Sequence, residues 1–321
     1  MKIRKRKNIL ITGGAGFIGS NFTRLILEKY PEAQITVVDK LTYAGDESNL
    51  SAIMDKIDFR REDIADAKSM MSLFEEKAFD TVINFAAESH VDRSLVDSSP
   101  FLRSNITGTA VLLEAARKFK PEVFCQISTD EIYGSIEEGS FTENSPMKPS
   151  SPYSASKAAA DNLANAYFTS FDVPIVITRS SNNYGPYQYP EKLIPFFTKR
   201  ALHGESLTLY GDGLNVRDWL HVEDNCKGIL TVIEKGVPGQ AYNIGANVEK
   251  TNAEIAEKII EITGNDVEIE YVKDRLGHDR RYSLDISKIK SLGWQPEADF
   301  EEKFEFTIKW YEENQDFWKK K

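Results

Sequence analysis

The sequence has few of the residues that build disulfide frameworks, metal centres or membrane spans. Its two cysteines, Cys125 and Cys226, provide neither a set of disulfides nor a four-cysteine zinc site, which favours a reducing, cytoplasmic compartment. The four histidines show no metal-ligand spacing, so we expect no metal site. No apolar run approaches the roughly 18 residues of a membrane-spanning helix. We therefore expect a protein without membrane association.

The chain also lacks net positive charge. Its formal net charge is −10, and because Lys2, Arg4, Lys5, Arg6 and Lys7 supply five positive charges at the start, the rest carries about −15. A folded body this acidic repels the phosphates of nucleic acids, which excludes a nucleic-acid binder. We expect the basic start to be a solvated terminus.

The composition is that of a globular protein, with 41% hydrophobic residues and a length that suits about two domains. In the first half, short apolar runs alternate with longer helical patterns, which is typical of βαβ units and a parallel sheet. The expected strands are Asn8–Thr12, Ile35–Asp39, Ile57–Arg61, Thr81–Phe85, Val123–Ser128 and Pro174–Thr178. The expected helices are Ile18–Tyr30, Ser69–Glu76, Thr107–Phe119, Asn252–Thr263 and Phe300–Glu313.

A glycine-rich turn follows the first expected strand and opens the first helix. Gly13, Gly16 and Gly19 are spaced G-x-x-G-x-x-G, which permits a tight turn and close approach of the backbone to a pyrophosphate at the helix N-terminus. Asp39 ends the second strand, 20 residues after Gly19, where a carboxylate can bind both ribose hydroxyls and repel a 2′-phosphate. The turn therefore predicts a dinucleotide site that prefers NAD to NADP, although the adjacent Lys40 argues the other way.

The predicted fold class is α/β, a doubly wound parallel (Rossmann) sheet with a smaller, mainly C-terminal substrate-binding domain. After about Ser180 the pattern loosens without a linker. We expect residues 1–180 to form the NAD-binding domain, with segments from about 216–246 returning to it, and residues 181–321 to bind mainly the substrate.

Polar residues follow four of the expected strands at their carboxyl ends. They are Asp63 with Ile64, the run 86–89, the run 129–131, and Asn182 with Asn183. Ligands of doubly wound sheets bind at that edge, so four such runs together indicate a site.

Tyr153 and Lys157 lie four residues apart at the start of an expected helix, which places both side chains on one face. A nearby ammonium stabilises phenolate and lowers the pKa of a tyrosine. The tyrosine can then take a hydroxyl proton while a cofactor takes hydride.

With the glycine turn, this pair makes the chain resemble the extended short-chain dehydrogenase/reductases, and within them the dTDP-glucose 4,6-dehydratase family. The similarity covers essentially the whole chain, and its most specific segments are 38–45, 86–94, 128–134, 181–187, 190–195 and 217–219. Related epimerases and decarboxylases usually have a small hydroxyl residue where this chain has Asp130.

The resemblance implies a mechanism for five catalytic residues, namely Thr129, Asp130, Glu131, Tyr153 and Lys157. Tyr153 deprotonates the sugar C4 hydroxyl while NAD takes the C4 hydride, and Thr129 hydrogen-bonds the 4-oxygen. Glu131 removes the C5 proton and Asp130 protonates the departing C6 hydroxyl, if their environments push their pKa values apart. NADH then returns hydride to C6, and Lys157 binds the nicotinamide ribose.

Two binding sites follow from the motifs and the resemblance. The cofactor site consists of Gly13, Gly16, Phe17, Ile18, Gly19, Asp39, Lys40, Thr42, Asp63, Ile64, Ala86, Ala87, Ser104, Tyr153, Lys157 and Asn183. The sugar-nucleotide site consists of Ser89, Thr129, Asn182, Lys192, Leu193, Arg217, Asn243, Arg275, His278 and Tyr282. Arginine and lysine suit the pyrophosphate of such a substrate.

The expected function is NAD-dependent dehydration of dTDP-glucose to dTDP-4-keto-6-deoxyglucose by a cytoplasmic lyase, feeding rhamnose or other deoxysugar biosynthesis. By resemblance we expect a homodimer. Three alternatives stay open: the same chemistry on a UDP- or CDP-sugar, 4-epimerisation, and a non-catalytic dinucleotide sensor. An epimerase would not need Asp130 and Glu131, and a sensor could also dispense with Tyr153 and Lys157.

Overall fold

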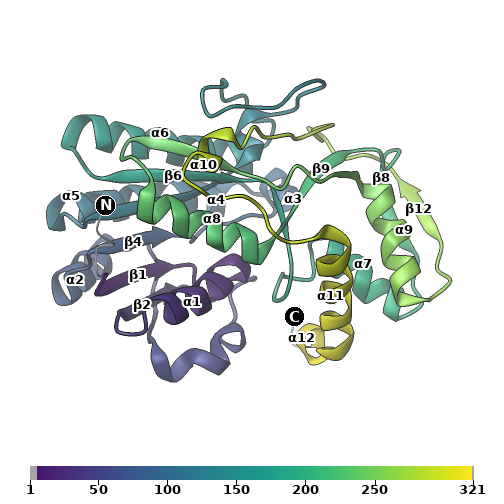
Figure 1. Cartoon of the computed structure of the whole chain (residues 1–321), viewed down its shortest axis with the longest axis horizontal. Coiled ribbons are helices and arrows are strands. Elements are labelled where there is room, and N and C mark those ends of the chain that lie inside the picture. Colours follow the sequence, from purple (N-terminus) through teal and green to yellow (C-terminus); the bar gives the residue numbers. More distant parts are fainter. Residues whose placement is uncertain (1–5, 320–321) are drawn as a thin grey trace.

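A seven-stranded parallel sheet forms the centre of the larger lobe (Figure 1). The computed structural model describes residues 6–319, and the strand order is β10-β6-β5-β4-β1-β2-β3. These strands are β1 (Asn8–Thr12), β2 (Gln34–Asp39), β3 (Asp58–Arg61), β4 (Thr81–Asn84), β5 (Val123–Thr129), β6 (Ile175–Ser180) and β10 (Gln240–Ile244). The order reverses between β1 and β4, where doubly wound sheets open a crevice. The predicted fold class is confirmed.

Helices cover both faces of this sheet. On one face lie α1 (Phe17–Lys29), η1 (Glu47–Lys56) and α8 (Val222–Lys235), and α1 packs against both of the others. On the other face lie α2 (Ala67–Lys77), α5 (Thr109–Phe119) and α6 (Pro152–Phe171), with α5 between its two neighbours. A π-helical segment, η2 (Leu102–Gly108), leads directly into α5, so the helical run that ends at Phe119 begins earlier than the predicted Thr107.

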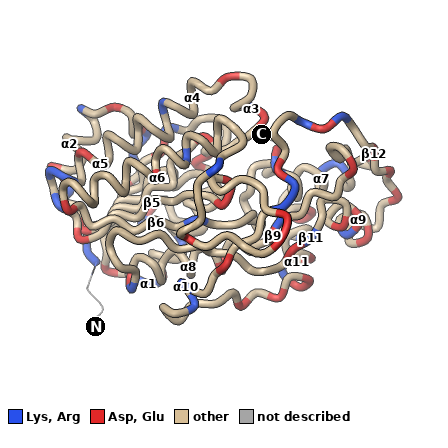
Figure 2. The backbone as a smooth tube through the Cα atoms, turned by 90° about the horizontal axis from the view of Figure 1, so that it is seen from above, with Lys and Arg blue, Asp and Glu red and all other residues tan. Residues whose placement is uncertain are grey.

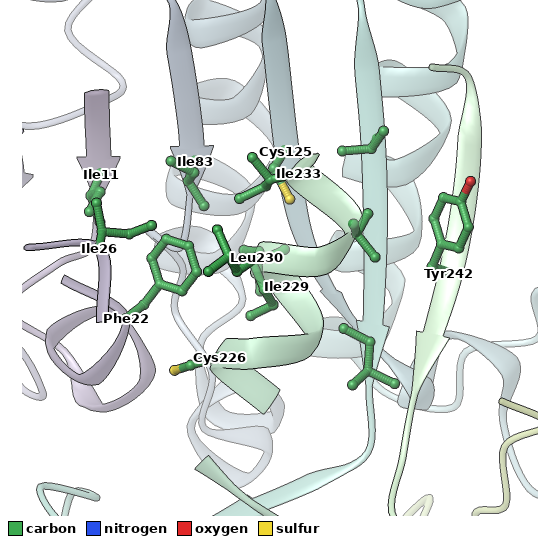
Figure 3. Close-up of a cluster of buried hydrophobic side chains, with 14 of the residues drawn as sticks. Ile11, Phe22, Ile26, Ile83, Cys125, Cys226, Ile229, Leu230, Ile233 and Tyr242 are labelled. Carbon is green, nitrogen blue, oxygen red and sulfur yellow. The ribbon is translucent and has the colours of Figure 1, made fainter. Parts of the chain in front are cut away.

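The core between α8 and the sheet is aliphatic and tightly buried. Figure 3 shows Ile229 and Ile233 of α8 pointing toward Ile83 and Cys125 of the strands, with Phe22 of α1 beside them. Ile229, Ile83 and Cys125 are fully buried. Cys125 is therefore a core residue, in agreement with its apolar surroundings in the sequence.

The smaller lobe carries two short sheets and three helices (Figure 1). Its strands are β7 (Asn182–Tyr184), β9 (Val216–His221) and β11 (Glu249–Thr251) in one sheet, and β8 (Leu207–Tyr210) and β12 (Ile269–Val272) in the other. Its helices are α7 (Leu193–Leu202), α9 (Asn252–Thr263) and α11 (Phe300–Glu313), which pack on one another. Short helical turns complete the chain, namely α3 (Val91–Val96), α4 (Ser99–Phe101), η3 (Asp130–Tyr133), α10 (Ser287–Lys290) and α12 (Asp316–Lys319).

The chain returns to the larger lobe after entering the smaller one. Helix α8 packs against α1, and β10 extends the large sheet beside β6. The sequence pattern predicts neither α7 nor α8 as a helix. Helix α7 contains Pro195 in its first turn, which weakens its helical pattern, whereas α8 buries Cys226, Ile229 and Ile233 at helical spacing.

Charged residues gather on the outer helices and loops, where Figure 2 shows acidic and basic positions interspersed, while β1, β4 and β5 carry none. Within residues 6–319, no helix combines the length and apolarity needed to cross a bilayer.

The prediction of a solvated basic start is wrong for Arg6. Its guanidinium donates to Thr81 Oγ1 (2.7 Å) and to the Ile233 carbonyl (2.8 Å), which ties the start of the chain to β4 and α8. Lys7 is exposed, while Lys2, Arg4 and Lys5 lie outside the described residues.

Replacing Ile229 by alanine should lower the free energy of unfolding by about 2–5 kcal/mol, because the cavity left between α8 and the sheet cannot fully collapse. Urea unfolding followed by circular dichroism measures this loss. Val237→Ala is the matched control, since Val237 is 57% exposed and its truncation leaves no cavity. Equal losses in the two variants would contradict the assignment of α8 to the core.

Candidate active site

A cavity of about 300 Å³ runs along the carboxyl edge of the large sheet. Its wall is built from the segments that follow six strands in turn, β1, β2, β3, β4, β5 and β6. All the residues predicted to bind the cofactor lie on this wall, as do the five predicted to be catalytic. The topology thus brings together groups that are up to 170 residues apart, from Gly13 to Asn183.

The glycine turn after β1 has the shape that a pyrophosphate requires. Gly13 has a φ of +68°, and a Cβ there would lie 2.5 Å from the Ala86 nitrogen. A Cβ on Gly19 would collide with the carbonyl of Gly13. Gly16 caps α1 without any side-chain hydrogen bond, so the first N–H groups of the helix remain available to an anion.

The acidic residue at the end of β2 is held firmly at the cavity wall. The Asp39 carboxylate accepts hydrogen bonds from the backbone nitrogens of Ala15 (3.0 Å) and Leu41 (2.8 Å). Lys40 forms an ion pair with Asp63 at 2.8 Å, and Arg103 binds the same carboxylate. Burial raises the pKa of Asp63, but the bonds from Lys40, the Ala65 nitrogen and Arg103 outweigh it and lower the pKa to about 2. Lys40 is thus already paired, which removes the objection to NAD.

Helix α6 presents Tyr153 and Lys157 to the cavity from its first two turns. A capping box between Ser151 and Ser154, with Pro152 at the first position, fixes where the helix begins. The Tyr153 nitrogen donates to Ser94 Oγ (3.2 Å). Lys157 Nζ donates to the Ile127 carbonyl at 2.5 Å, and burial lowers the pKa of Lys157 to about 8.

The expectation that Lys157 lowers the pKa of Tyr153 is not met in this structure. Burial, with the nearby Glu131 carboxyl, raises the pKa of Tyr153 well above its ordinary value, and a bond to Thr129 offsets only part of this shift. The Lys157 ammonium is instead committed to the Ile127 carbonyl. A positive charge closer to the Tyr153 hydroxyl would favour its phenolate form.

Asp130 and Glu131 follow β5 directly, in the turn η3. Asp130 is only 2% exposed, and its Oδ1 accepts from Thr129 Oγ1 at 3.2 Å. Burial and the neighbouring Glu131 and Asp218 raise the pKa of Asp130 far above its ordinary value. Burial also raises the pKa of Glu131, but three cations, Lys192, Arg275 and Arg217, oppose that shift. Asp130 is therefore suited to hold a proton, and Glu131 to accept one.

The pattern of residues matches a known family. Residues 10–307 match the family model described as GDP-mannose 4,6 dehydratase. The chain belongs to the GDP-mannose 4,6 dehydratase family.

Relatives of this family cover nearly the whole chain. The low-salt glycan biosynthesis protein Agl12 of Haloferax volcanii is 48% identical over 307 residues, which is 95% of this chain and 98% of the relative. A dTDP-glucose 4,6-dehydratase of an Actinoplanes species is 48% identical over 319 residues, 97% of this chain and 99% of the relative. The crystal structure of DesIV, a dTDP-glucose 4,6-dehydratase from Streptomyces venezuelae solved with NAD bound, superimposes with a TM-score of 0.94 at 45% identity, covering 97% of this chain and 98% of DesIV.

The residues that this family member was expected to use for its substrate divide into two groups. Ser89, Thr129, Asn182 and Lys192 line the cavity, and Lys192 Nζ donates to the Ser89 carbonyl (2.8 Å). Arg217, Arg275, His278 and Tyr282 lie outside the cavity wall, on β9 and the segment after β12.

The second group is nevertheless close to the first. Arg217 and Arg275 oppose the upward pKa shift of Glu131, and the Glu131 carboxyl in turn raises the pKa of Tyr282. The Arg217 guanidinium lies over the Tyr282 ring, 4.3 Å from its centroid. Arg275 Nη1 donates to Asp92 Oδ1 (3.1 Å), so the segment after β12 is bonded to α3. The His278 ring binds Asp274 (2.7 Å).

Asn243 and Leu193 are placed differently from the prediction. All the side-chain atoms of Asn243 that can hydrogen-bond are used within the protein, because Oδ1 accepts from Tyr133 (2.8 Å) and Nδ2 donates to the carbonyls of Phe141 and Asp285. Leu193 begins α7 and packs against the core of the smaller lobe rather than lining the cavity.

Sequence reasoning missed part of the cavity wall. Tyr43 and Tyr189 meet edge to face at 5.4 Å, and the Arg93 guanidinium lies 3.9 Å from the centre of the Tyr43 ring. Glu88 and Glu191 also line the cavity, and burial raises the pKa of both. All but Tyr189 stand in motifs that were recognised, but nothing local to a motif shows which of its side chains are buried.

Gly19→Ala should reduce the affinity for a dinucleotide by about tenfold or more, because overpacking the turn costs about 1–3 kcal/mol. The measurement is the nucleotide released when the purified protein is denatured with acid. Gly264→Ala is the control: unlike Gly19, Gly264 has a positive φ (+66°), so alanine strains the backbone there, but Gly264 ends α9 outside the cavity with open space around it. Unchanged nucleotide content in Gly19→Ala would remove this turn from the cofactor site.

Proposed function

We propose that the chain is an NAD-dependent dTDP-glucose 4,6-dehydratase, a hydro-lyase that forms dTDP-4-keto-6-deoxyglucose. The observation that carries the proposal is that the buried Asp130 and the half-buried Glu131 lie in the same cavity as Tyr153 and Lys157. An oxidation needs only the second pair, whereas loss of water needs an acid and a base as well. The relatives named dTDP-glucose 4,6-dehydratase support the same assignment.

The cavity wall fits NAD. The backbone of the glycine turn and the open first turn of α1 would hold the pyrophosphate, and Asp39 would bind the ribose hydroxyls. When bound, NAD would supply a hydride acceptor for C4, a hydride donor for C6 in its reduced form, and a positively charged ring. Lys157 and Ser104 would bind the rest of the cofactor from α6 and η2.

Tyr153 would take the proton of the sugar C4 hydroxyl. Burial and the nearby Glu131 carboxyl raise its pKa, so the positive charge of bound NAD and of Lys157 would have to favour the phenolate. Thr129, whose bond already favours the ionised form of Tyr153, would hold the oxygen at C4.

Glu131 and Asp130 would carry out the elimination. Once C4 is a ketone, the C5 proton is acidic, and Glu131 would remove it. Asp130, kept protonated by its burial and by the carboxyls around it, would give its proton to the C6 hydroxyl as this leaves as water. Lys192, Arg217 and Arg275 would face the diphosphate of the substrate, since they provide positive charge near Glu131 on an otherwise acidic protein.

The same geometry argues against two alternatives. A 4-epimerase has no step for Asp130, which would then be a buried acid without use. A non-catalytic sensor would need none of the four ionisable residues. A UDP- or CDP-sugar dehydratase would keep all of them, and thymine differs from uracil by one methyl group, worth only about 1 kcal/mol of apolar contact.

The location and assembly of the enzyme are part of the proposal. A cytoplasmic homodimer that supplies deoxysugar synthesis, such as that of rhamnose, fits the acidic composition, the free cysteines Cys125 and Cys226, and the resemblance to the family.

Purified protein without added NAD should convert dTDP-glucose to a product lighter by one water. Mass spectrometry of parallel reactions with dTDP-glucose and UDP-glucose measures this. Water loss only from the UDP-sugar would overturn the substrate and keep the chemistry. No reaction with either sugar, even after NAD is added, would overturn the proposed function.

Asp130→Asn should slow the loss of water by about 100- to 10,000-fold, because the amide cannot give a proton. Oxidation at C4 should persist, so reduced nicotinamide and the 4-keto sugar should accumulate in a single turnover. The control is Asp55→Asn, since Asp55 is exposed on η1 and outside the cavity. Dehydration at the normal rate in Asp130→Asn would remove Asp130 as the acid.

A further inference from the structure

A buried arginine lies behind the active site without touching the cavity. Arg179 is on β6, is 3% exposed, and is in register with Ser128 on β5 and Asn243 on β10. It does not line the cavity, although Ser180, the next residue, does. A buried cation of this kind is retained only where its hydrogen bonds are fully used.

The guanidinium of Arg179 bonds in two directions. Its Nε donates to Asp161 Oδ2 at 3.0 Å, and Asp161 is fully buried on α6, one turn after Lys157. Its Nη1 donates to the Tyr133 hydroxyl at 2.7 Å and to the Glu143 carbonyl at 3.2 Å. The first bond reaches the helix that carries the oxidation pair, and the second reaches the turn that carries the elimination pair.

The hydrogen bond from Arg179 to Tyr133 can fix the position of the turn η3. It is the last residue of η3, two positions after Glu131, and is 1% exposed. Its hydroxyl accepts from Arg179 and donates to Asn243 Oδ1, while its ring stacks on Phe141 with centroids 5.0 Å apart. The ring is therefore fixed on both sides, and with it the turn that holds Asp130 and Glu131.

We propose that Arg179 is a positioning residue that holds the acid–base turn η3 at a fixed distance from Tyr153 and Lys157 on α6, with Tyr133 and Asp161 as its two contacts. This proposal rests on the proposed function, because it assigns the two elements to successive steps of one reaction. Arginine suits the task, since its rigid planar fork can bind two partners in fixed directions, whereas a lysine ammonium on a flexible stem cannot.

The Asp161 contact also carries charge. Asp161 would be a bare buried carboxylate without Arg179, and it is the charged group that opposes the downward pKa shift of Lys157. The Tyr133 contact carries no charge, so it can be cut without exposing a buried ion.

The test is Tyr133→Phe, which removes one hydroxyl and leaves the ring in place. Misplacement of reacting groups by about 1 Å can cost about 100-fold in rate, so elimination should slow by roughly 10- to 100-fold. Oxidation at C4 should be unchanged, because Asp161 and α6 keep their bond to Arg179. Single-turnover reactions with dTDP-glucose, quenched and analysed for the 4-keto sugar and the 4-keto-6-deoxy product, measure both rates.

The matched control is Tyr242→Phe. Tyr242 is 2% exposed on β10, and its hydroxyl accepts from the Val237 nitrogen (2.9 Å), away from the cavity. Tyr242→Phe should lower the melting temperature, as Tyr133→Phe does. The ratio of the elimination rate to the oxidation rate should stay as in the wild type. An unchanged ratio in Tyr133→Phe, or an equal slowing of both steps, would overturn the proposal.

Arg179→Lys provides a second, independent variant should Tyr133→Phe not fold. The ammonium keeps a positive charge beside Asp161 but cannot also hold Tyr133, so the same selective slowing of elimination is expected. A normal ratio in Arg179→Lys would overturn the proposal. Wild-type protein that does not dehydrate dTDP-glucose would instead overturn the proposed function, so the two failures are distinguishable.

Discussion

The parallel pairing of β5 with β4 and β6 is the constraint on which the site depends. In this register Asn84 lies opposite Gln126, and Thr129 lies opposite Ser180. Buried side-chain hydrogen bonds join β1, β4 and β5: Thr12 donates to Asn84 (2.7 Å), and Asn84 donates to Gln126 (2.9 Å). Every strand of a parallel sheet ends at the same edge, so the segments that follow them share one cavity.

Burial at that edge sets the protonation of the reacting groups. The same loss of water raises the pKa of Asp130 and lowers that of Lys157 to about 8, because it disfavours the charged form of each. Each pKa unit corresponds to about 1.4 kcal/mol, so a site of several such groups is costly to fold. The apolar core offsets this free-energy cost, since the strands β1, β4 and β5 contain no charged residue. These adjacent carboxyls therefore lie in different surroundings, as the proposed roles of Asp130 as acid and Glu131 as base require.

The motifs could be predicted from the sequence because each depends on residues that are close together in the chain. The glycine turn, Asp39, and the spacing of Tyr153 and Lys157 all follow from the geometry of one turn or one helix. The helices Asn252–Thr263 and Phe300–Glu313 have the limits that their patterns predict, since capping side chains of Thr251 and Asp299 mark their first turns. In contrast, α7 was missed because Pro195 lies in its first turn, and α8 was missed although its buried residues Cys226, Ile229 and Ile233 have helical spacing.

The sequence by itself determined the fold class, the cofactor turn and the identity of the ionisable residues, because these depend on local spacing and side-chain chemistry. Only the tertiary structure decided what surrounds each of them. It paired Lys40 with Asp63, used the side chain of Asn243 in hydrogen bonds within the protein, and reversed the expected pKa shift of Tyr153. A pKa and a hydrogen-bond partner depend on desolvation and on charges brought from other elements, and the distance between such elements is not encoded in any one stretch of sequence.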